Sequence, residues 1–95
     1  MSRKIAVVIP TYGQFDYALK CLDSLVRLTA DYQCIVIDDG SPDWSDAVRA
    51  DIEHIVPRQH LHLERFETNR GLTAAWNQGL TLARQFGNPC AALVY

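Results

Sequence analysis

The stretch Ile35-Val36-Ile37-Asp38-Asp39-Gly40-Ser41-Pro42-Asp43 decides how this sequence folds. An apolar run typical of a buried strand leads directly into two adjacent carboxylates and a turn. Upstream, the apolar run from Ile5 to Ile9 ends in a similar way, at Pro10-Thr11-Tyr12-Gly13. Continuously apolar strands are typical of parallel sheets that are covered on both faces. Because open α/β folds bind ligands at the carboxyl ends of their strands, these two polar strand ends predict a shared ligand-binding crevice.

Alternating strand and helix patterns extend from this stretch to both ends of the chain. Apolar residues at helical spacing predict helices from Phe15 to about Leu28, after a Ser41 cap up to Pro57, and from about Leu72 to Phe86. In the last of these helices the residues expected to face inward are Trp76, Leu80, Ala83 and Phe86. The stretch from His60 to Glu64 alternates polar and apolar residues, which predicts an edge strand with one solvated face, and Cys90–Tyr95 is expected to form a further buried strand. The sequence therefore predicts an α/β fold with a Rossmann-like parallel sheet of about four strands and alternating helices.

Composition narrows the class of protein. The 95 residues are 48% hydrophobic and 21% charged, with a net charge of -2, which is typical of one soluble globular domain. No basic excess is present to neutralise phosphates, so a nucleic-acid partner is not expected. No apolar run approaches the roughly 18 residues of a membrane span. The three cysteines are odd in number and lack C-x-x-C spacing, so we expect reduced thiols in a cytoplasmic protein and no disulfide framework or zinc site.

The residues at the two strand ends suggest ligand chemistry. Asp38 and Asp39 could accept hydrogen bonds from a base or ribose, or ligate a divalent metal; the alternative is a solvated turn in which Asp39 caps the following helix. Tyr12 is suited to stacking on a nucleobase, or could pack on the first helix. Thr11 could bond a base edge or cap that helix, and Pro10 would stiffen the end of the strand.

A second group of candidates precedes and enters the third helix. Gly71 suggests a positive φ or a close approach to a ligand, and Arg70 could meet a phosphate. The alternative for Asn69 is a capped helix start, and Asn77 in the helix interior would ordinarily face solvent. The pair His60 and His62 is expected at the surface of an edge strand and not around a metal. Motifs of dinucleotide-binding Rossmann units, P-loops and nucleophile elbows are absent from the sequence.

Taken together, four motifs resemble the start of a family 2 glycosyltransferase with the GT-A fold. They are Val8-Ile9-Pro10-Thr11-Tyr12, Leu19-x-x-Leu22-x-Ser24-Leu25, Val36-Ile37-Asp38-Asp39-Gly40-Ser41, and Asn69-x-Gly71 followed by Asn77. The resemblance covers essentially the whole chain, and the order and spacing of the motifs are more specific than any one of them. Gly13 departs from the family, which often has Asn after the Tyr, and this affects only the local turn.

The resemblance implies a role for each motif in binding a nucleotide. Thr11 and Tyr12 would line the base pocket, and Asp39 would accept the N–H of a uracil-type base. The loop around Asn69 and Gly71 would close near the diphosphate of a UDP-, GDP- or dTDP-sugar, and Asn77 would support the site. The expected nucleotide-binding set is Pro10, Thr11, Tyr12, Asp38, Asp39, Asn69, Gly71 and Asn77.

The resemblance also implies what lies outside the chain. Residues 1–95 are expected to form the N-terminal, nucleotide-binding part of a GT-A domain, truncated before the Asp-x-Asp-type motif. The ligands of a Mn²⁺ or Mg²⁺ ion and the catalytic base would follow Tyr95, so this piece is expected to be inactive alone. The full-length protein would transfer a sugar to the hydroxyl of a glycan, lipid-linked or protein acceptor, with inversion and a bound metal. Its location would be cytoplasmic, with peripheral attachment to the cytoplasmic face of a membrane as an option.

Two other readings stay open at the level of the sequence. One is a phosphoryl-transfer or receiver-like α/β domain that uses Asp38 and Asp39 as an acidic Mg²⁺ pocket. The other is a GT-A-like module that binds without catalysis. In either case the unpaired edge of the strand Cys90–Tyr95 is expected to favour a homodimer.

Overall fold

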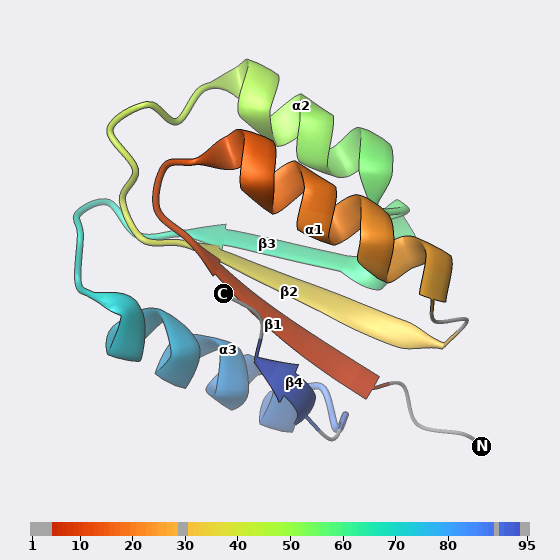
Figure 1. The fold of residues 1–95 in the computed structure, drawn as a ribbon. Helices are drawn as coiled ribbons and strands as arrows, with labels where there is room; N and C mark the ends of the chain where they lie inside the picture. The colour runs from red at the N-terminus through yellow and green to blue at the C-terminus, as the bar shows by residue number, and fades with distance from the viewer. Residues whose placement is uncertain (1–4, 29–30, 89, 94–95) are drawn as a thin grey trace.

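The computed structural model of the protein describes residues 5–28, 31–88 and 90–93. Strands and helices alternate along this part of the chain, as Figure 1 shows. The elements are β1 (Ile5–Thr11), α1 (Phe15–Leu28), β2 (Tyr32–Asp38), α2 (Asp46–Ile55), the short 3₁₀ helix η1 (Arg58–His60), β3 (Leu61–Arg65), α3 (Leu72–Gln85) and β4 (Cys90–Leu93). The predicted order of elements is confirmed.

The described strands form one parallel sheet in the order β3-β2-β1-β4. β1 pairs with β2 along its whole length, from Ile5 opposite Tyr32 to Thr11 opposite Asp38. β4 pairs only with Ala6–Val8, through a register shift. On the β4 side, therefore, no described strand covers β1 from Ile9 onward, and this leaves an open edge beside the carboxyl end of the strand.

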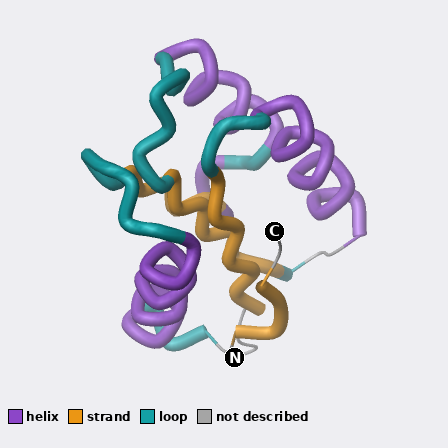
Figure 2. Tube along the Cα trace, turned by 60° about the vertical axis from the view of Figure 1, so that its left-hand side comes forward, coloured by secondary structure: helices purple, strands orange, loops and turns teal. Residues whose placement is uncertain are grey.

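Helices cover both faces of the sheet. α1 and α2 lie together on one face and α3 lies on the other, so that the strands form the middle layer (Figures 1 and 2). Alternate side chains of each strand enter the two apolar clusters that result. Val8, Ile35 and Ile37 lie on the α3 side, and Val7, Ile9 and Val36 lie on the α1/α2 side. This two-sided burial explains why the strand sequences are continuously apolar.

Three local predictions are wrong. The N-cap of α2 is Ser45, whose hydroxyl accepts a hydrogen bond from the amide of Val48 at 3.3 Å, whereas Ser41 is fully buried and bonded to Asp38. β3 is an edge strand as predicted, but its polar face is only partly open to solvent, since the side chains of His62 and Glu64 are 33% and 35% exposed. Glu64 on that face accepts a hydrogen bond from Gln78 of α3 at 2.7 Å. The alternating pattern therefore marks a face that α3 covers in part. Phe86, expected to face inward, is the C-cap residue of α3 and is 42% exposed.

The histidine pair divides between two environments. His60 belongs to η1, where its ring stacks on Tyr32 with centroids 4.7 Å apart and its Nδ1 lies 2.9 Å from the Tyr32 carbonyl oxygen. His62 lies on β3 beside Phe86, with ring centroids 5.2 Å apart. The described residues contain no group of three or more His, Cys, Asp or Glu side chains placed to hold a metal ion.

Three predictions concern membrane spans, the cysteines and the last strand. None of the helices in the described part of the chain has the length and hydropathy that crossing a lipid bilayer requires. Cys21 and Cys34 are free thiols. The predicted strand at Cys90–Tyr95 is confirmed over Cys90–Leu93; residues 94–95 lie outside the described residues, and dimerisation through this edge stays a prediction.

Candidate functional site

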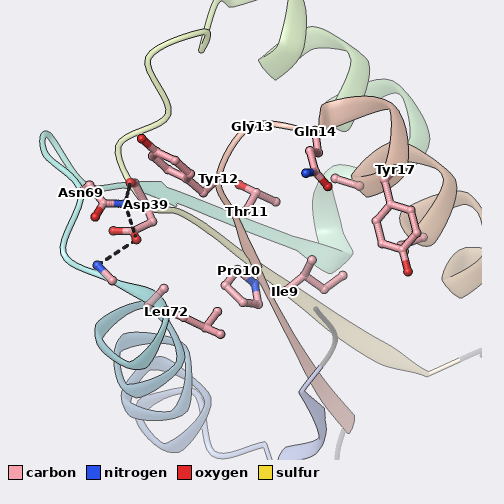
Figure 3. Close-up of a pocket in the computed structure, with 14 residues that line it drawn as sticks. Ile9, Pro10, Thr11, Tyr12, Gly13, Gln14, Tyr17, Asp39, Asn69 and Leu72 are labelled. Carbon is pink, nitrogen blue, oxygen red and sulfur yellow. Dashed lines mark hydrogen bonds between the residues drawn. The ribbon is translucent and has the colours of Figure 1, made fainter.

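A cavity of about 360 Å³ opens at the carboxyl end of β1, between the first turns of α1 and α3 (Figure 3). It borders the edge of β1 that β4 leaves uncovered. Its lining comes from the end of β1, the loop that follows, the first half of α1, the residue after β2 and the start of α3. The lining residues are Ile9, Pro10, Thr11, Tyr12, Gly13, Gln14, Tyr17, Ala18, Cys21, Asp39, Asn69, Gly71, Leu72 and Ala75.

The end of β1 supplies one wall of the cavity. Pro10 has no amide hydrogen to donate, and it occupies the part of β1 for which the described residues provide a strand partner on the β2 side alone. Thr11 is 6% exposed, and its hydroxyl donates a hydrogen bond to Asp38 Oδ1 at 2.8 Å. Tyr12 is 55% exposed and lines the cavity, so it is accessible to a ligand there. The wall therefore offers a stiff backbone and one accessible aromatic face.

Asp39 supplies a carboxylate to the cavity. Its side chain is almost fully buried, and its amide donates to the Thr11 carbonyl oxygen at 2.8 Å, which extends the β1–β2 ladder. Asp39 Oδ1 accepts from the Arg70 amide at 2.7 Å, and Oδ2 accepts from the Gly71 amide and from Asn69 Nδ2, both at 2.9 Å. A carboxylate has about four acceptor positions. Three donors from the chain leave one position for a ligand.

The contacts of Asp39 exclude one of the two roles predicted for it, that of a helix cap for α2. Asp39 does not cap the helix that follows it in the chain, since the cap of α2 is Ser45. It fixes instead the loop before α3, where Gly71 is the N-cap residue with φ +95° and no side-chain cap bond. The predicted positive φ at Gly71 is confirmed, and both Asn69 and Gly71 line the cavity.

A close backbone approach brings Asp39 to this loop. Gly40 has φ +70°, and a Cβ atom there would lie 2.5 Å from the carbonyl carbon of Thr68 and 2.6 Å from the amide nitrogen of Asn69. Glycine is therefore required at position 40 for two reasons: the left-handed backbone and the missing side chain. The turn after β2 and the loop before α3 can then touch, which places the Asn69 amide against the Asp39 carboxylate.

Asp38 differs from its neighbour in every contact. It is 0% exposed and does not line the cavity. Its carboxylate accepts from the Thr11 hydroxyl, the Ser41 hydroxyl at 2.7 Å and the Ser41 amide at 2.9 Å, and Arg65 Nε lies 3.3 Å from its Oδ2. Three hydrogen bonds and one ion pair thus enclose the Asp38 carboxylate, and because it is fully buried it is not accessible to a ligand in the cavity.

Two further candidates lie outside the cavity lining. Asn77 is an exposed residue of α3. The guanidinium of Arg70 lies 4.4 Å from the centroid of the Phe66 ring, in a cation–π contact. Of the expected nucleotide-binding set, the cavity thus brings together Pro10, Thr11, Tyr12, Asp39, Asn69 and Gly71, and Asp38 and Asn77 lie outside it.

The sequence analysis missed the α1 side of the cavity. Gln14 directly precedes α1, and Tyr17, Ala18 and Cys21 lie three, four and seven residues after it, which places these three on one face of the helix. Since α1 begins directly after the Tyr12 loop, the same spacing could have identified them. The 58% exposure of Tyr17 makes it the second accessible aromatic residue of the cavity.

Comparison with known proteins places these features in a family. The model of glycosyl transferase family 2 matches residues 6–85, which is most of the chain. Glycosyltransferase GlyA of Streptococcus pneumoniae is 37% identical over 78 residues, covering 81% of this chain and 11% of that protein. The uncharacterized glycosyltransferase EpsJ of Bacillus subtilis is 32% identical over 82 residues, covering 84% of this chain and 23% of that protein. The chain therefore spans about a tenth to a quarter of the length of these relatives.

A solved structure shares the fold. The mannosyltransferase PcManGT from Pyrobaculum calidifontis, in complex with GDP-Man and Mn²⁺, superposes with a TM-score of 0.73 at 22% identity, over 87% of this chain and 25% of that one. The predicted GT-A arrangement of strands and helices is thereby confirmed. Together with the family match over residues 6–85, it shows that this chain belongs to glycosyl transferase family 2.

Proposed function

We propose that this chain forms the nucleoside-binding part of an enzyme that transfers a sugar from a nucleotide-diphosphate donor to an acceptor hydroxyl. The observation that carries the proposal is the pairing of Tyr12 and Asp39 at one cavity. An accessible ring and a buried carboxylate with one acceptor position left suit a nucleobase, which presents an aromatic face and N–H donors. Family membership supports the same chemistry.

Each wall of the cavity has a task in this proposal. The ring of Tyr12 stacks on the base, an interaction worth about 1–3 kcal/mol per base. Asp39 accepts one N–H of the base. The Thr11 hydroxyl donates its proton in the hydrogen bond to Asp38, so it can only accept a hydrogen bond from a ligand. The loop at Asn69 and Gly71, held by Asp39, lies at the start of α3, where the positive end of the helix favours an anionic diphosphate.

The single acceptor position of Asp39 favours one class of base. Uracil and thymine present one imide N–H, which needs one acceptor. Guanine presents N1–H beside an amino group, and a carboxylate that bound both would need both of its oxygens free. Asp39 Oδ2 already accepts two hydrogen bonds, so UDP and dTDP fit better than GDP. The GDP-Man in the PcManGT structure belongs to that protein, and the two chains share only 22% of their residues.

The described residues do not fit the divalent metal that the family implies. A divalent cation needs several oxygen ligands. The Asp39 carboxylate is surrounded by three N–H donors, and Asp38 is enclosed by Thr11, Ser41 and Arg65. Neither carboxylate is arranged as a metal ligand. We therefore place the metal ligands and the catalytic base of the proposed inverting transfer outside the described residues, and we expect no transfer by the 95-residue chain alone.

The same contacts weigh against a receiver-like, Mg²⁺-dependent phosphoryl-transfer domain. Such a domain needs carboxylates open to a cation and to a phosphoryl group. Asp38 is buried beside a guanidinium, and Asp39 holds a loop. A GT-A-like module that binds a nucleotide without catalysis remains the second candidate, because the cavity alone does not distinguish it from an enzyme.

The test is a titration of the chain with UDP, dTDP and GDP by NMR, with and without Mn²⁺. We expect amide shifts at Tyr12, Asp39 and Gly71 with UDP or dTDP, and weaker shifts with GDP. The Asp39→Asn variant keeps the shape of the side chain and removes the charge, and it is expected to lose most of the binding. Asp51→Asn, at an exposed position of α2, is the matched control. Absence of shifts with all three nucleotides at millimolar concentration would contradict the proposal.

A further inference from the structure

The two residues that flank Tyr12 are both tied to one buried carboxylate. On one side, the Thr11 hydroxyl donates directly to Asp38 Oδ1 at 2.8 Å. On the other side, the Gly13 amide donates to Ser41 Oγ at 2.8 Å, and Ser41 Oγ donates its own proton to Asp38 Oδ1 at 2.7 Å. Tyr12, the exposed ring at the cavity, thus lies between two anchors that share one acceptor atom.

Ser41 is the relay of this arrangement. A hydroxyl has one proton, and here that proton goes to Asp38, so the oxygen lone pairs are available to the Gly13 amide. The Ser41 amide also donates to Asp38 Oδ2 at 2.9 Å, which fixes the backbone of the relay. Ser41 is 0% exposed, so water does not replace these bonds in the folded chain.

Arg65 completes the arrangement from the neighbouring strand. Its Nη2 donates to the Ser41 carbonyl oxygen at 2.8 Å, and its Nε lies 3.3 Å from Asp38 Oδ2. The guanidinium also lies 5.7 Å from the centroid of the Trp44 ring. A buried carboxylate is stable only when it is paired and hydrogen-bonded. Arg65 supplies the ion pair, Thr11 and Ser41 supply the hydrogen bonds, and Arg65 also holds Ser41 on its carbonyl side.

We propose that Asp38, Ser41 and Arg65 are positioning residues that set the orientation of Tyr12 toward the nucleobase, with the Ser41 hydroxyl as the relay. None of the three lines the cavity, so they act on the ligand through Tyr12. The inference rests on the proposed function, because it presupposes a base that stacks on Tyr12. It assigns the first and last residues of the Asp-Asp-Gly-Ser stretch, Asp38 and Ser41, to holding the loop after β1 and not to contacting the ligand.

The experiment is a double-mutant cycle on UDP binding. The four proteins are the wild type, Ser41→Ala, Tyr12→Ala and the double variant, each titrated with UDP by NMR or calorimetry. We expect Ser41→Ala to weaken UDP binding about five- to tenfold in the wild-type background and to have little effect when Tyr12 is already Ala. Ser24→Ala, at an exposed position of α1, is the control and should bind like the wild type.

The other outcomes would contradict either the positioning role of Ser41 or the proposed nucleotide binding. An equal loss in both backgrounds would show that Ser41 acts through general stability and would overturn the positioning role alone. Unchanged binding by Ser41→Ala would do the same. If the wild type bound no nucleotide, the proposed function would fall, and this inference with it. Ser41→Cys keeps the side-chain size and weakens both hydrogen bonds, so it takes the place of Ser41→Ala in the cycle should the latter not fold.

Discussion

Asn69 Nδ2 lies 2.9 Å from Asp39 Oδ2 and joins the loop before α3 to the end of β2, across 30 positions of sequence. The amides of Arg70 and Gly71 converge on the same carboxylate. The contact therefore has two consequences: it fixes the start of α3, and it consumes acceptor positions that a ligand would otherwise use. Both consequences can be measured.

We expect Asn69→Ala to lower the free energy of unfolding by about 1–2 kcal/mol, because a hydrogen bond to a charged group is lost while the two backbone donors remain. Amide hydrogen exchange in the first turn of α3 should accelerate. Asn77→Ala is the matched control, since Asn77 is exposed on the same helix, and its stability should change by a few tenths of a kcal/mol at most. A loss of UDP binding by Asn77→Ala would support the role that the family resemblance implies for it.

Gly40→Ala should be strongly destabilising. Its Cβ would lie 2.5 Å from the backbone of Thr68, and the residue has φ +70°, so neither the neighbour nor the backbone can adapt at small cost. We expect a loss of about 3 kcal/mol or more in urea denaturation. Gly87→Ala separates the two causes, because Gly87 has φ +75° and no atom within 4 Å of its Cβ position. That variant should lose only about 1 kcal/mol; equal losses at the two sites would contradict the close approach.

The ion pair between Arg65 and Asp38 should contribute far more to the free energy of unfolding than the pair between Arg27 and Asp23. The Arg65 side chain is 31% exposed and its Asp38 partner 0%, whereas Arg27 and Asp23 are 74% and 50% exposed. Removing Arg65 leaves the buried Asp38 without its ion-pair partner, so Arg65→Ala is expected to lower the free energy of unfolding by about 3 kcal/mol. Arg27→Ala should change it by about 0.5 kcal/mol or less. Comparable values for the two variants, or a strong salt dependence of the Arg65 effect, would argue against burial of the pair.

The alternation of strand side chains explains why two adjacent carboxylates have different roles. Asp38 continues the Cys34 and Val36 series toward α1 and α2, where Thr11 and Arg65 also point. Asp39 follows the Ile35 and Ile37 series toward α3. This period of two is visible in the sequence. It predicts that the two carboxylates lie on opposite faces of the sheet, but it does not show which of them meets the cavity, because Thr11 on the Asp38 side also lines it.

Other features of the site could not be derived in this way. Ser41 and Ser45 are both acceptable helix caps by residue type. The choice between them depends on Asp38, which binds Ser41 and leaves Ser45 for α2. The covering of Glu64 likewise depends on where α3 crosses the sheet. Local periodicity predicted the elements well, whereas these partners are set by contacts between distant segments.

The thiol of Cys34 on β2 is buried. Cys34 is 0% exposed, and burial raises its pKa to about 12. Burial also raises the pKa of its neighbour Tyr32, with a smaller contribution from the Cys34 charge. A thiol in the unfolded chain ionises near pH 9. The folded state therefore holds the Cys34 proton over a range of pH in which the unfolded state releases it.

The ionisation of Cys34 therefore leaves the free energy of unfolding unchanged below about pH 9. As the pH rises from there toward 12, the unfolded state loses the thiol proton and the fold is progressively destabilised. We expect the free energy of unfolding to fall by up to about 1.4 kcal/mol per pH unit in that range, measured by urea denaturation between pH 7 and 10.5. Cys34→Ala should be less stable at neutral pH, because it leaves a cavity, but should show a shallower alkaline slope. Cys21→Ala, at a partly exposed position of α1, should keep the wild-type slope. If Cys34 instead reacted with a thiol reagent as fast as Cys21 in the folded chain, its burial would be contradicted.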